Sequence, residues 1–455
     1  MGLNKGDIVD IELVDLANGG DSVGRYEDLV LFVPGGIPGE EVRVRIVEKK
    51  KNYARGELVE VLRPARERIK AACPVFGTCG GCQLQHIAYD KQVEYKGKMV
   101  KDLLERIGRL ENIELQPALP SPQAFFYRNK AQFPLARDRD GEIIAGFYAR
   151  GSHDIVPLET CPIQHPLINR TLQKSLEVLN AYPDLTVYNE KNHKGLLRHL
   201  VIRTGVCTNQ VLLVLVTSGK DLPHAGEIAE RIMKEIPEIV GVLQNINMER
   251  TNVILGQETR VIAGQDYYLD YIGNIKFAIS NNSFFQVNTL QTKNLYDLVV
   301  DFAGLTGKET VIDAYCGLGS ISLYLADKAR EVIGIEEVPV AIEDAGNNAS
   351  LNDINNCRFI TGKVEDKLPE LLAEGIKPDL IVFDPPRKGL AKEVIDAVIE
   401  VKPERIVYVS CNPATLARDL ALFKEDYRIL KVQPVDMFPN TYHVECVTLM
   451  SRVEK

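Results

Sequence analysis

The sequence has 455 residues, of which 45% are apolar and 26% are charged, so it can bury several hydrophobic cores and is not a disordered chain. Its 54 basic and 63 acidic residues give a net charge of −9, which excludes a uniformly basic nucleic-acid coat. The longest apolar run covers only six residues, 211–216, and the N-terminus lacks an apolar signal segment, so we expect a soluble, cytoplasmic protein with no membrane span.

Residues 1–62 are predicted to form a small OB-type β-barrel, because short strands alternate with the turn sequences NGGDS and PGGIPGE. The expected strands cover residues 7–13, 28–33, 41–48 and 54–61. Between residues 41 and 70, ten basic residues outnumber five acidic ones, which makes this segment a candidate RNA contact or, alternatively, a solvated loop. The segments NGGDSVGR and LFVPGGIPGEEV resemble the TRAM domain, an RNA-binding barrel attached to RNA-modifying enzymes.

Residues 63–280 are predicted to form a separate α+β domain that carries a metal site. Three cysteines cluster as Cys73-x5-Cys79-x2-Cys82, a spacing typical of metal ligands. A disulfide framework is not expected, because the chain has an odd number of cysteines, nine, and no secretory signal. Buried strands are expected at residues 196–204, 210–217 and 241–246, with a helix over 227–235.

Residues 281–455 alternate regularly between strands and helices, which predicts a doubly wound, Rossmann-like α/β sheet with ligands at the carboxyl ends of its strands. The expected strands cover residues 310–315, 331–336, 379–384, 405–410 and 442–450. The expected helices cover residues 320–328, 339–351, 392–400 and 413–423.

The first loop of this sheet, in VIDAYCGLGSISL, predicts a nucleoside site. Gly317 and Gly319 permit a tight turn between strand and helix, so that the backbone can approach a ligand closely. The pattern is neither GxGxxG nor a P-loop, which argues against a pyrophosphate ligand. Glu336 ends the next strand, where its carboxylate can accept both ribose hydroxyls. Together these features favour S-adenosylmethionine, with a dehydrogenase-type dinucleotide as the alternative.

Two further strand ends carry reactive side chains. Asp384 in FDPPRKG is fixed by two prolines and can hydrogen-bond cofactor or substrate, unless this segment is only a turn that ends the strand. Cys411 lies between a strand and a helix N-terminus, where a thiolate is stabilised and nucleophilic. The alternative role for this cysteine is a small buried apolar residue.

The last strand begins at HVECV and offers two candidate bases, His443 and Glu445. The two side chains share one face of a strand, so their spacing cannot choose between them. A nucleophilic thiol, a base and a methyl donor point to methylation of pyrimidine carbon 5, which becomes nucleophilic after thiolate addition at carbon 6. The target base must leave its stack to reach such a site.

The motifs DAYCGLG, DPPRKG, SCNPATLARD and HVECV, with SFFQVN upstream, resemble the RNA uracil-5-methyltransferases over nearly the whole chain. The resemblance implies a class I methyltransferase domain in which Cys411 is the nucleophile and Glu445, not His443, is the base. It also implies contacts to S-adenosylmethionine from Gln286, Tyr315, Glu336 and Asp384.

The same resemblance implies that Cys161 joins Cys73, Cys79 and Cys82 as ligands of a [4Fe–4S] cluster, with zinc as the alternative on chemistry alone. A TRAM barrel together with this cysteine set is similar to the ribosomal branch of the family, so the expected product is 5-methyluridine in 23S rRNA. A tRNA T-loop uridine is the alternative substrate. A non-catalytic RNA-binding or chaperone protein is the alternative from another class, and no motif indicates an obligate protein partner.

Overall fold

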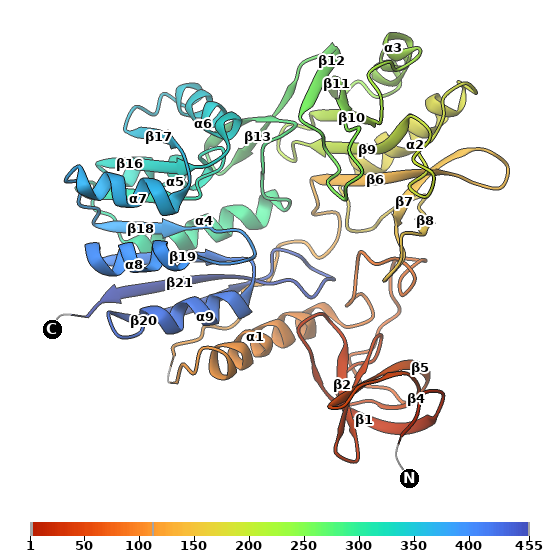
Figure 1. Ribbon diagram of the computed structural model, residues 1–455, viewed down its shortest axis with the longest axis horizontal. Coiled ribbons are helices and arrows are strands. Elements are labelled where there is room, and N and C mark those ends of the chain that lie inside the picture. The colour runs from red at the N-terminus through yellow and green to blue at the C-terminus, as the bar shows by residue number, and fades with distance from the viewer. Residues whose placement is uncertain (1–2, 112, 454–455) are drawn as a thin grey trace.

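The computed structural model describes residues 3–111 and 113–453, which form a small barrel, a central mixed sheet and a larger, mainly parallel sheet (Figure 1). In the view of Figure 1 the larger sheet lies on the left, the central sheet at the upper right and the barrel, in red, at the lower right. Within these described ranges, no helix has both the length and the apolar character that a membrane span requires.

The N-terminal strands close into a barrel in the order β1-β2-β3-β5-β4, which confirms the predicted barrel. Val42, Val44 and Ile46 alternate with more exposed residues along β4 and fill the interior. Gly56 is needed opposite them, because a Cβ atom there would lie 2.0 Å from Val44 Cγ1. The strands are β1 (Ile8–Leu16), β2 (Ser22–Tyr26), β3 (Leu29–Val33), β4 (Glu41–Lys49) and β5 (Tyr53–Arg63).

The central sheet has seven strands in the order β12-β11-β10-β9-β6-β7-β8. Every residue of β9 and β10 is buried, because one face packs with α2 and α3 and the other with the core of the larger sheet. Its elements are β6 (Lys130–Arg137), β7 (Ile143–Tyr148), β8 (Ile155–Pro157), α2 (Pro166–Asn180), β9 (Leu197–Thr204), β10 (Val211–Thr217), α3 (Ala225–Glu235), β11 (Ile239–Ile246) and β12 (Glu258–Gly264).

The larger sheet has the order β17-β16-β15-β18-β19-β21-β20, in which the first five strands are parallel, as predicted for a doubly wound fold. The chain order reverses between β15 and β18, which is where such sheets bind ligands. Its elements are α4 (Thr289–Ala303), β15 (Thr310–Ala314), α5 (Ser320–Leu325), η1 (Ala326–Lys328), β16 (Glu331–Glu336), α6 (Pro339–Leu351), β17 (Cys357–Thr361), α7 (Val364–Ala373), β18 (Leu380–Phe383), α8 (Lys392–Val401), β19 (Arg405–Ser410), α9 (Pro413–Phe423), β20 (Tyr427–Val435) and β21 (Glu445–Arg452).

Two segments that precede residue 281 pack with this larger sheet. Helix α1 (Tyr89–Arg106) lies along α9, and its Met99 and Val100 share a buried cluster with Phe423. The hairpin of β13 (Tyr267–Ile272) and β14 (Ile275–Ser280) packs on α4 and α6. The division into 1–62, 63–280 and 281–455 stays a prediction, but the core of the last region draws on both earlier segments.

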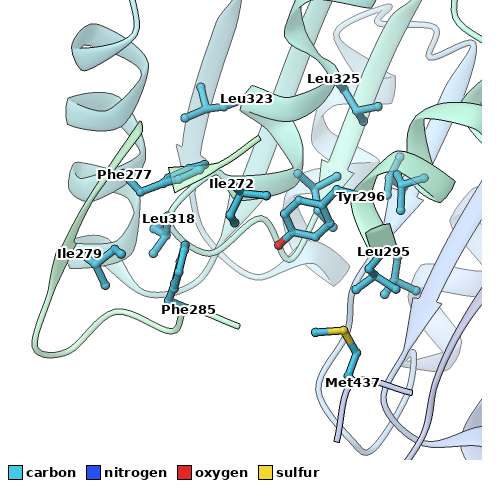
Figure 2. Close-up of a cluster of buried hydrophobic side chains, with 14 of the residues drawn as sticks. Ile272, Phe277, Ile279, Phe285, Leu295, Tyr296, Leu318, Leu323, Leu325 and Met437 are labelled. Carbon is cyan, nitrogen blue, oxygen red and sulfur yellow. The ribbon is translucent and has the colours of Figure 1, made fainter. Parts of the chain in front are cut away.

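The β13–β14 hairpin contributes side chains to a cluster of buried hydrophobic residues (Figure 2). Phe277 and Ile279 of β14 contribute to the same cluster as Phe285, Leu318 and Met437. Each of the last three lies in a segment next to a predicted site residue. Phe285 belongs to SFFQVN, Leu318 to the glycine loop and Met437 to the loop before Glu445. Their burial therefore anchors these three segments against one core.

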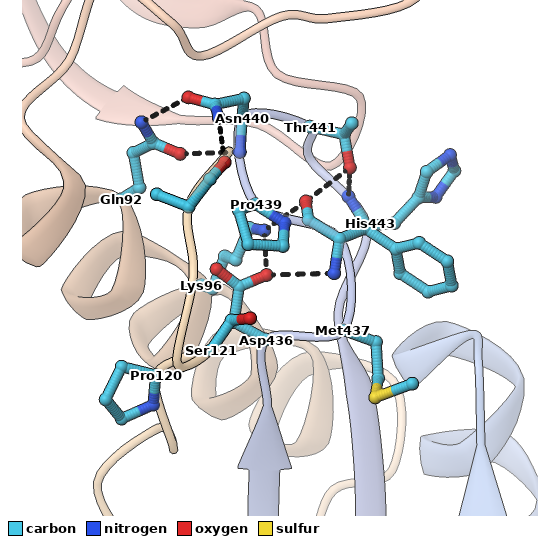
Figure 3. Close-up of polar contacts among 12 residues, drawn as sticks. Gln92, Lys96, Pro120, Ser121, Asp436, Met437, Pro439, Asn440, Thr441 and His443 are labelled. Carbon is cyan, nitrogen blue, oxygen red and sulfur yellow. Dashed lines mark hydrogen bonds and ion pairs between the residues drawn. The ribbon is translucent and has the colours of Figure 1, made fainter. Parts of the chain in front are cut away.

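The loop 436–444, which joins β20 to β21, is fastened to α1 by a buried ion pair (Figure 3). Lys96 Nζ lies 2.6 Å from Asp436 Oδ1 and also donates a hydrogen bond to the Phe438 carbonyl at 3.0 Å. The two charged side chains are 1% and 0% exposed, respectively. Burial lowers the pKa of Lys96, and the attraction of Asp436 opposes this shift.

We predict that Lys96→Met lowers the free energy of unfolding by about 3–5 kcal/mol, because Asp436 would remain buried without a counter-charge. Lys293→Met is the matched control: Lys293 pairs with Asp297 one helical turn away, but both side chains are about half exposed. The control should change stability by less than about 0.5 kcal/mol. Urea denaturation measures both, and equal midpoints for the two variants would contradict the prediction.

Candidate active site

The loop after β15 has the predicted tight turn. Gly317 and Gly319 have φ of 55° and 82°, and Tyr315 also has a left-handed backbone, with φ of 69°. A non-glycine residue in this region is uncommon and costs free energy, which marks functional loops. The Tyr315 and Cys316 amides hold the strained turn by donating to the Ile335 carbonyl at 2.9 and 3.0 Å.

Glu336, at the end of β16, faces this loop. Its Oε2 accepts a hydrogen bond from the Gly317 amide at 3.2 Å, and its Oε1 accepts one from the Val338 amide at 3.0 Å. The carboxylate thus fixes the glycine loop to the neighbouring strand end. Its predicted contact with a ribose stays a prediction.

A cavity of about 590 Å³ opens at the carboxyl ends of β15, β16, β18 and β19; we call it the strand-end cavity. This volume is typical of sites for small molecules and cofactors. All six residues predicted for the catalytic and cofactor sites line it: Gln286, Tyr315, Glu336, Asp384, Cys411 and Glu445. The fold therefore brings together residues that are as much as 159 positions apart, from Gln286 to Glu445.

Two carboxyl groups give the strand-end cavity an unusual electrostatic character. Glu445 is 2% exposed, and its Oε2 has no hydrogen-bond partner among the described residues. Burial and the nearby Asp384 raise the pKa of Glu445, while Arg387 opposes the shift. Burial and Asp313 likewise raise the pKa of Asp384. A buried carboxyl group without a partner is suited to proton transfer.

Cys411 lies between β19 and the N-cap residue of α9, as predicted, but the pKa of its thiol is raised. Burial and the carboxyl groups of Glu445 and Asp384 raise its pKa to about 12, and Arg387 only partly offsets them. The expectation of a thiolate stabilised by the helix N-terminus is therefore wrong, because the pKa of this thiol is raised and not lowered. Desolvation and two acidic neighbours outweigh the helix dipole.

His443 lies on another side of the nucleophile. It lines a smaller cavity of about 150 Å³ together with Cys411, and it does not line the strand-end cavity. Burial, with Arg387 as the next cause, lowers its pKa to about 4, so the imidazole is neutral at neutral pH. Both candidate bases thus lie near Cys411, but only Glu445 faces the cavity that contains the glycine loop.

Arg387 is a site residue that the sequence did not predict. It lies in the DPPRKG segment, lines both cavities and has Nη2 at 3.4 Å from the His443 ring nitrogens. Its carbonyl accepts a hydrogen bond from Asn412 Nδ2 at 3.1 Å, which ties the segment to the helix cap after Cys411. The signal was present in the sequence, since Arg387 follows Asp384 by three positions in DPPRKG, and its charge acts on the Glu445 carboxyl group.

Comparison with known proteins identifies the family to which this site belongs. Residues 88–453 match the family described as tRNA (Uracil-5-)-methyltransferase, and residues 2–59 match the TRAM domain. The chain belongs to the tRNA (uracil-5-)-methyltransferase family. The predicted membership and the predicted TRAM barrel are both confirmed.

Similar proteins cover the whole chain. A Bacillus cereus protein named as an uncharacterized RNA methyltransferase is 47% identical over 454 residues, which span 100% of this chain and 98% of the relative. A Clostridium tetani protein of the same name is 44% identical over 99% of this chain and 97% of its own length. The crystal structure of Pyrococcus abyssi tRNA (uracil-54, C5)-methyltransferase in complex with S-adenosyl-L-homocysteine has a TM-score of 0.77 and 28% identity, covering 97% of this chain and 99% of the other. This similarity confirms the class I methyltransferase fold.

The chain has its four predicted metal ligands around a second cavity, of about 620 Å³, which we call the cysteine cavity. Cys73, Cys79, Cys82 and Cys161 all line it, and none forms a disulfide. Burial raises the pKa of Cys82 to about 12 and that of Cys161 to about 11. Among the described residues, no three His, Cys, Asp or Glu side chains are arranged to hold a single metal ion. The metal site itself stays a prediction.

Most of the basic side chains between residues 41 and 70 pair with carboxylates, and their contact with RNA stays a prediction. The paired residues are six of the ten: Arg43, Arg45, Lys50, Arg55, Arg63 and Arg68. The Lys49 ammonium donates to the Leu3 carbonyl. Three of the partner carboxylates, Asp10, Asp21 and Glu40, lie outside residues 41–70, so they offset three of the five excess positive charges. Basic side chains also line the cysteine cavity, where Arg128, Lys130 and Arg198 form part of the wall.

The raised pKa of Cys411 predicts slow alkylation. With a pKa of about 12, roughly one thiol in ten thousand is ionised at pH 8, so the rate with iodoacetamide should rise about tenfold per pH unit from pH 7 to 10. Glu445→Gln removes a negative neighbour and should accelerate alkylation at pH 8, while Arg387→Met removes the cation and should slow it. Mass spectrometry measures Cys411 against the exposed Cys207. Equal rates in both variants would contradict this electrostatic account.

Proposed function

We propose that this chain transfers a methyl group from S-adenosylmethionine to carbon 5 of a uridine in RNA, through a covalent bond between Cys411 and carbon 6 of the base. One observation carries the proposal: Cys411 and Glu445 face the same cavity as the glycine loop and Glu336. A nucleophile, a base and a nucleoside-binding loop are thus within reach of one ligand pair. Methylation of an exocyclic amine or a hydroxyl group would not need the thiol.

Four residues are proposed to hold the methyl donor. Glu336 would accept the ribose hydroxyls, and Gln286, Tyr315 and Asp384 would contact the rest of the molecule from the other walls of the cavity. The complex of the Pyrococcus abyssi enzyme with S-adenosyl-L-homocysteine supports this assignment, since its fold matches along 97% of this chain. The donor supplies an electrophilic methyl group on a positively charged sulfur.

The chain's own residues carry the other steps. Cys411 adds as thiolate to carbon 6, so that carbon 5 gains the electron density to take the methyl group as the donor's S–CH₃ bond breaks. Glu445 then removes the proton from carbon 5 through Oε2, the oxygen without a partner among the described residues. The C6–S bond breaks, the base becomes 5-methyluracil, and Cys411 leaves as thiolate. Glu445 finally releases the proton to solvent.

The RNA is proposed to be 23S rRNA, because the TRAM barrel and the cysteine set resemble the ribosomal branch. A tRNA T-loop uridine is the second candidate, favoured by the similarity to a tRNA (uracil-54, C5)-methyltransferase that extends over the barrel as well. Mapping 5-methyluridine in 23S rRNA and tRNA from a deletion strain separates the two. Loss from tRNA alone would overturn the ribosomal assignment, and loss from neither RNA would favour a non-catalytic RNA-binding protein.

The cysteine site is proposed to hold a [4Fe–4S] cluster. Four thiols on one cavity of about 620 Å³ match the donor set of such a cluster. A single zinc ion would require all four sulfur atoms to come within about 2.3 Å of one point. The ligands of the cluster would be Cys73, Cys79, Cys82 and Cys161, and the cluster would hold together the loops that carry these cysteines.

The catalytic pair predicts two different defects. Cys411→Ala should abolish turnover but change the affinity for S-adenosylmethionine by less than about threefold, because the thiol serves the base. Glu445→Gln should instead accumulate a methylated protein–RNA adduct that survives denaturation, since only proton removal is lost. Gel analysis with labelled methyl donor measures methylated RNA and the adduct, and calorimetry measures the affinity for S-adenosylmethionine. Sustained methylation by the alanine variant would refute covalent catalysis.

The metal assignment predicts about four irons per chain after anaerobic purification, with a brown colour. Cys79→Ser should lose this iron, and Cys207→Ser, which changes an exposed cysteine elsewhere, should retain it. Metal analysis and absorption spectra decide. Colourless protein with one zinc per chain would show that the cluster assignment is wrong and would leave the catalytic assignment untouched.

A further inference from the structure

Asn440, in the middle of loop 436–444, makes more contacts than a loop residue needs. It is 2% exposed and has a left-handed backbone, with φ of 68°. Its backbone amide donates a hydrogen bond to Gln92 Oε1 at 2.9 Å, and its side-chain Oδ1 accepts one from Gln92 Nε2 at 3.2 Å (Figure 3). Its Nδ2 donates to the Ala124 carbonyl at 2.6 Å. Both ends of this side chain are therefore bound to segments outside the loop.

The Asn440 carbonyl contacts the cysteine segment. It accepts hydrogen bonds from the amides of Gln83 and Leu84, at 3.1 and 3.0 Å, and these residues directly follow Cys82. Gln85 Oε1 in turn accepts from the Cys73 amide at 3.0 Å. Cys82 is thus connected through one short backbone segment to a residue that precedes Glu445 by five positions.

The barrel reaches the same place. A Cβ atom on Gly20 would lie 2.8 Å from Gln83 Cβ and 3.4 Å from Tyr442 Cβ, so this barrel loop is packed against both the cysteine segment and loop 436–444. On the other side, Lys96 holds Asp436 and Phe438. The loop that precedes Glu445 therefore contacts the cysteine segment, the barrel and helix α1, and Asn440 itself bonds to the first and the last of these.

We propose that Asn440 is a positioning residue that transmits the placement of the cysteine segment to Glu445. This inference rests on the proposed function, because it assigns to the loop the task of aligning the base that removes the carbon-5 proton. Cys411 lies between β19 and α9, outside this loop. Disturbing Asn440 should therefore slow the last step of the reaction more than the first.

Asn440→Gly tests the proposal. Glycine adopts a positive φ without steric cost, so the backbone bonds can persist while both side-chain bonds are lost. Because small misplacements of a base cost up to about 100-fold in rate, turnover should fall about 10- to 100-fold. The rate of the first methyl transfer in a single turnover should change less than about threefold, and the methylated adduct should accumulate. Asn209→Gly is the matched control, since Asn209 has φ of 57° in an exposed turn.

The coupling to the cysteine segment is tested by Cys82→Ser. This variant should show the same excess of adduct over released product, and the double variant with Asn440→Gly should show no larger excess, because both changes act on the placement of the same loop before Glu445. Cys207→Ser should behave like the unaltered protein. Additive effects of the two changes would overturn the coupling.

The remaining outcomes are equally decisive. Equal loss of methyl transfer and release, or no loss of either, would overturn the positioning role. If Asn440→Gly no longer binds S-adenosylmethionine in calorimetry, Gln92→Met removes the partner from α1 instead. Failure of both variants to bind the donor would mean that the network serves folding alone. If the unaltered protein methylates no uridine, the proposed function itself fails, which this experiment reports separately.

Discussion

The loop between β20 and β21 is the constraint on which the site depends. It has no regular secondary structure, yet it must keep Glu445 in a buried position, so its polar groups need partners from elsewhere. Lys96 satisfies Asp436 and the Phe438 carbonyl, Tyr127 donates to the Pro439 carbonyl, and Asn288 donates to the Met437 carbonyl. These partners come from α1, the segment before β6 and the start of α4. The need to satisfy one buried loop thus explains why distant parts of the chain converge beside the larger sheet.

The electrostatics of the strand-end cavity follow from the same burial. Asp384, Glu445 and the Cys411 thiol all have raised pKa values, because each would carry a negative charge in a poorly solvated space. Arg387 only partly offsets the raised pKa values of Cys411 and Glu445. Under the proposed function, a methyl donor with a positively charged sulfur would add positive charge beside these three groups and favour the Cys411 thiolate.

Much of the fold and the site is written locally in the sequence. Strand ends followed by Gly317, Asp384 or Cys411 could be placed because turn chemistry and alternation act over a few residues. Helix α1 was missed, because its buried face carries Gln92 and Lys96, so the apolar period is interrupted where the helix binds the loop. The ten basic residues of 41–70 can be counted in the sequence, but their ion pairs cannot be predicted from it, because each pair depends on which strands lie side by side. The pKa of Cys411 depends on Glu445, which lies 34 residues away along the chain, and spacing alone does not reveal that contact.

Covalent methylation at carbon 5 is the central claim, and RNA that contains 5-fluorouridine tests it most directly. Fluorine at carbon 5 cannot be removed by a base, so the reaction should stop after methyl transfer with Cys411 still bonded to carbon 6. Digestion and mass spectrometry should then recover the Cys411 peptide with one fluorouridine nucleotide and one added methyl group, only when S-adenosylmethionine is present. Methylated RNA without any such peptide, or an adduct on another residue, would contradict the account.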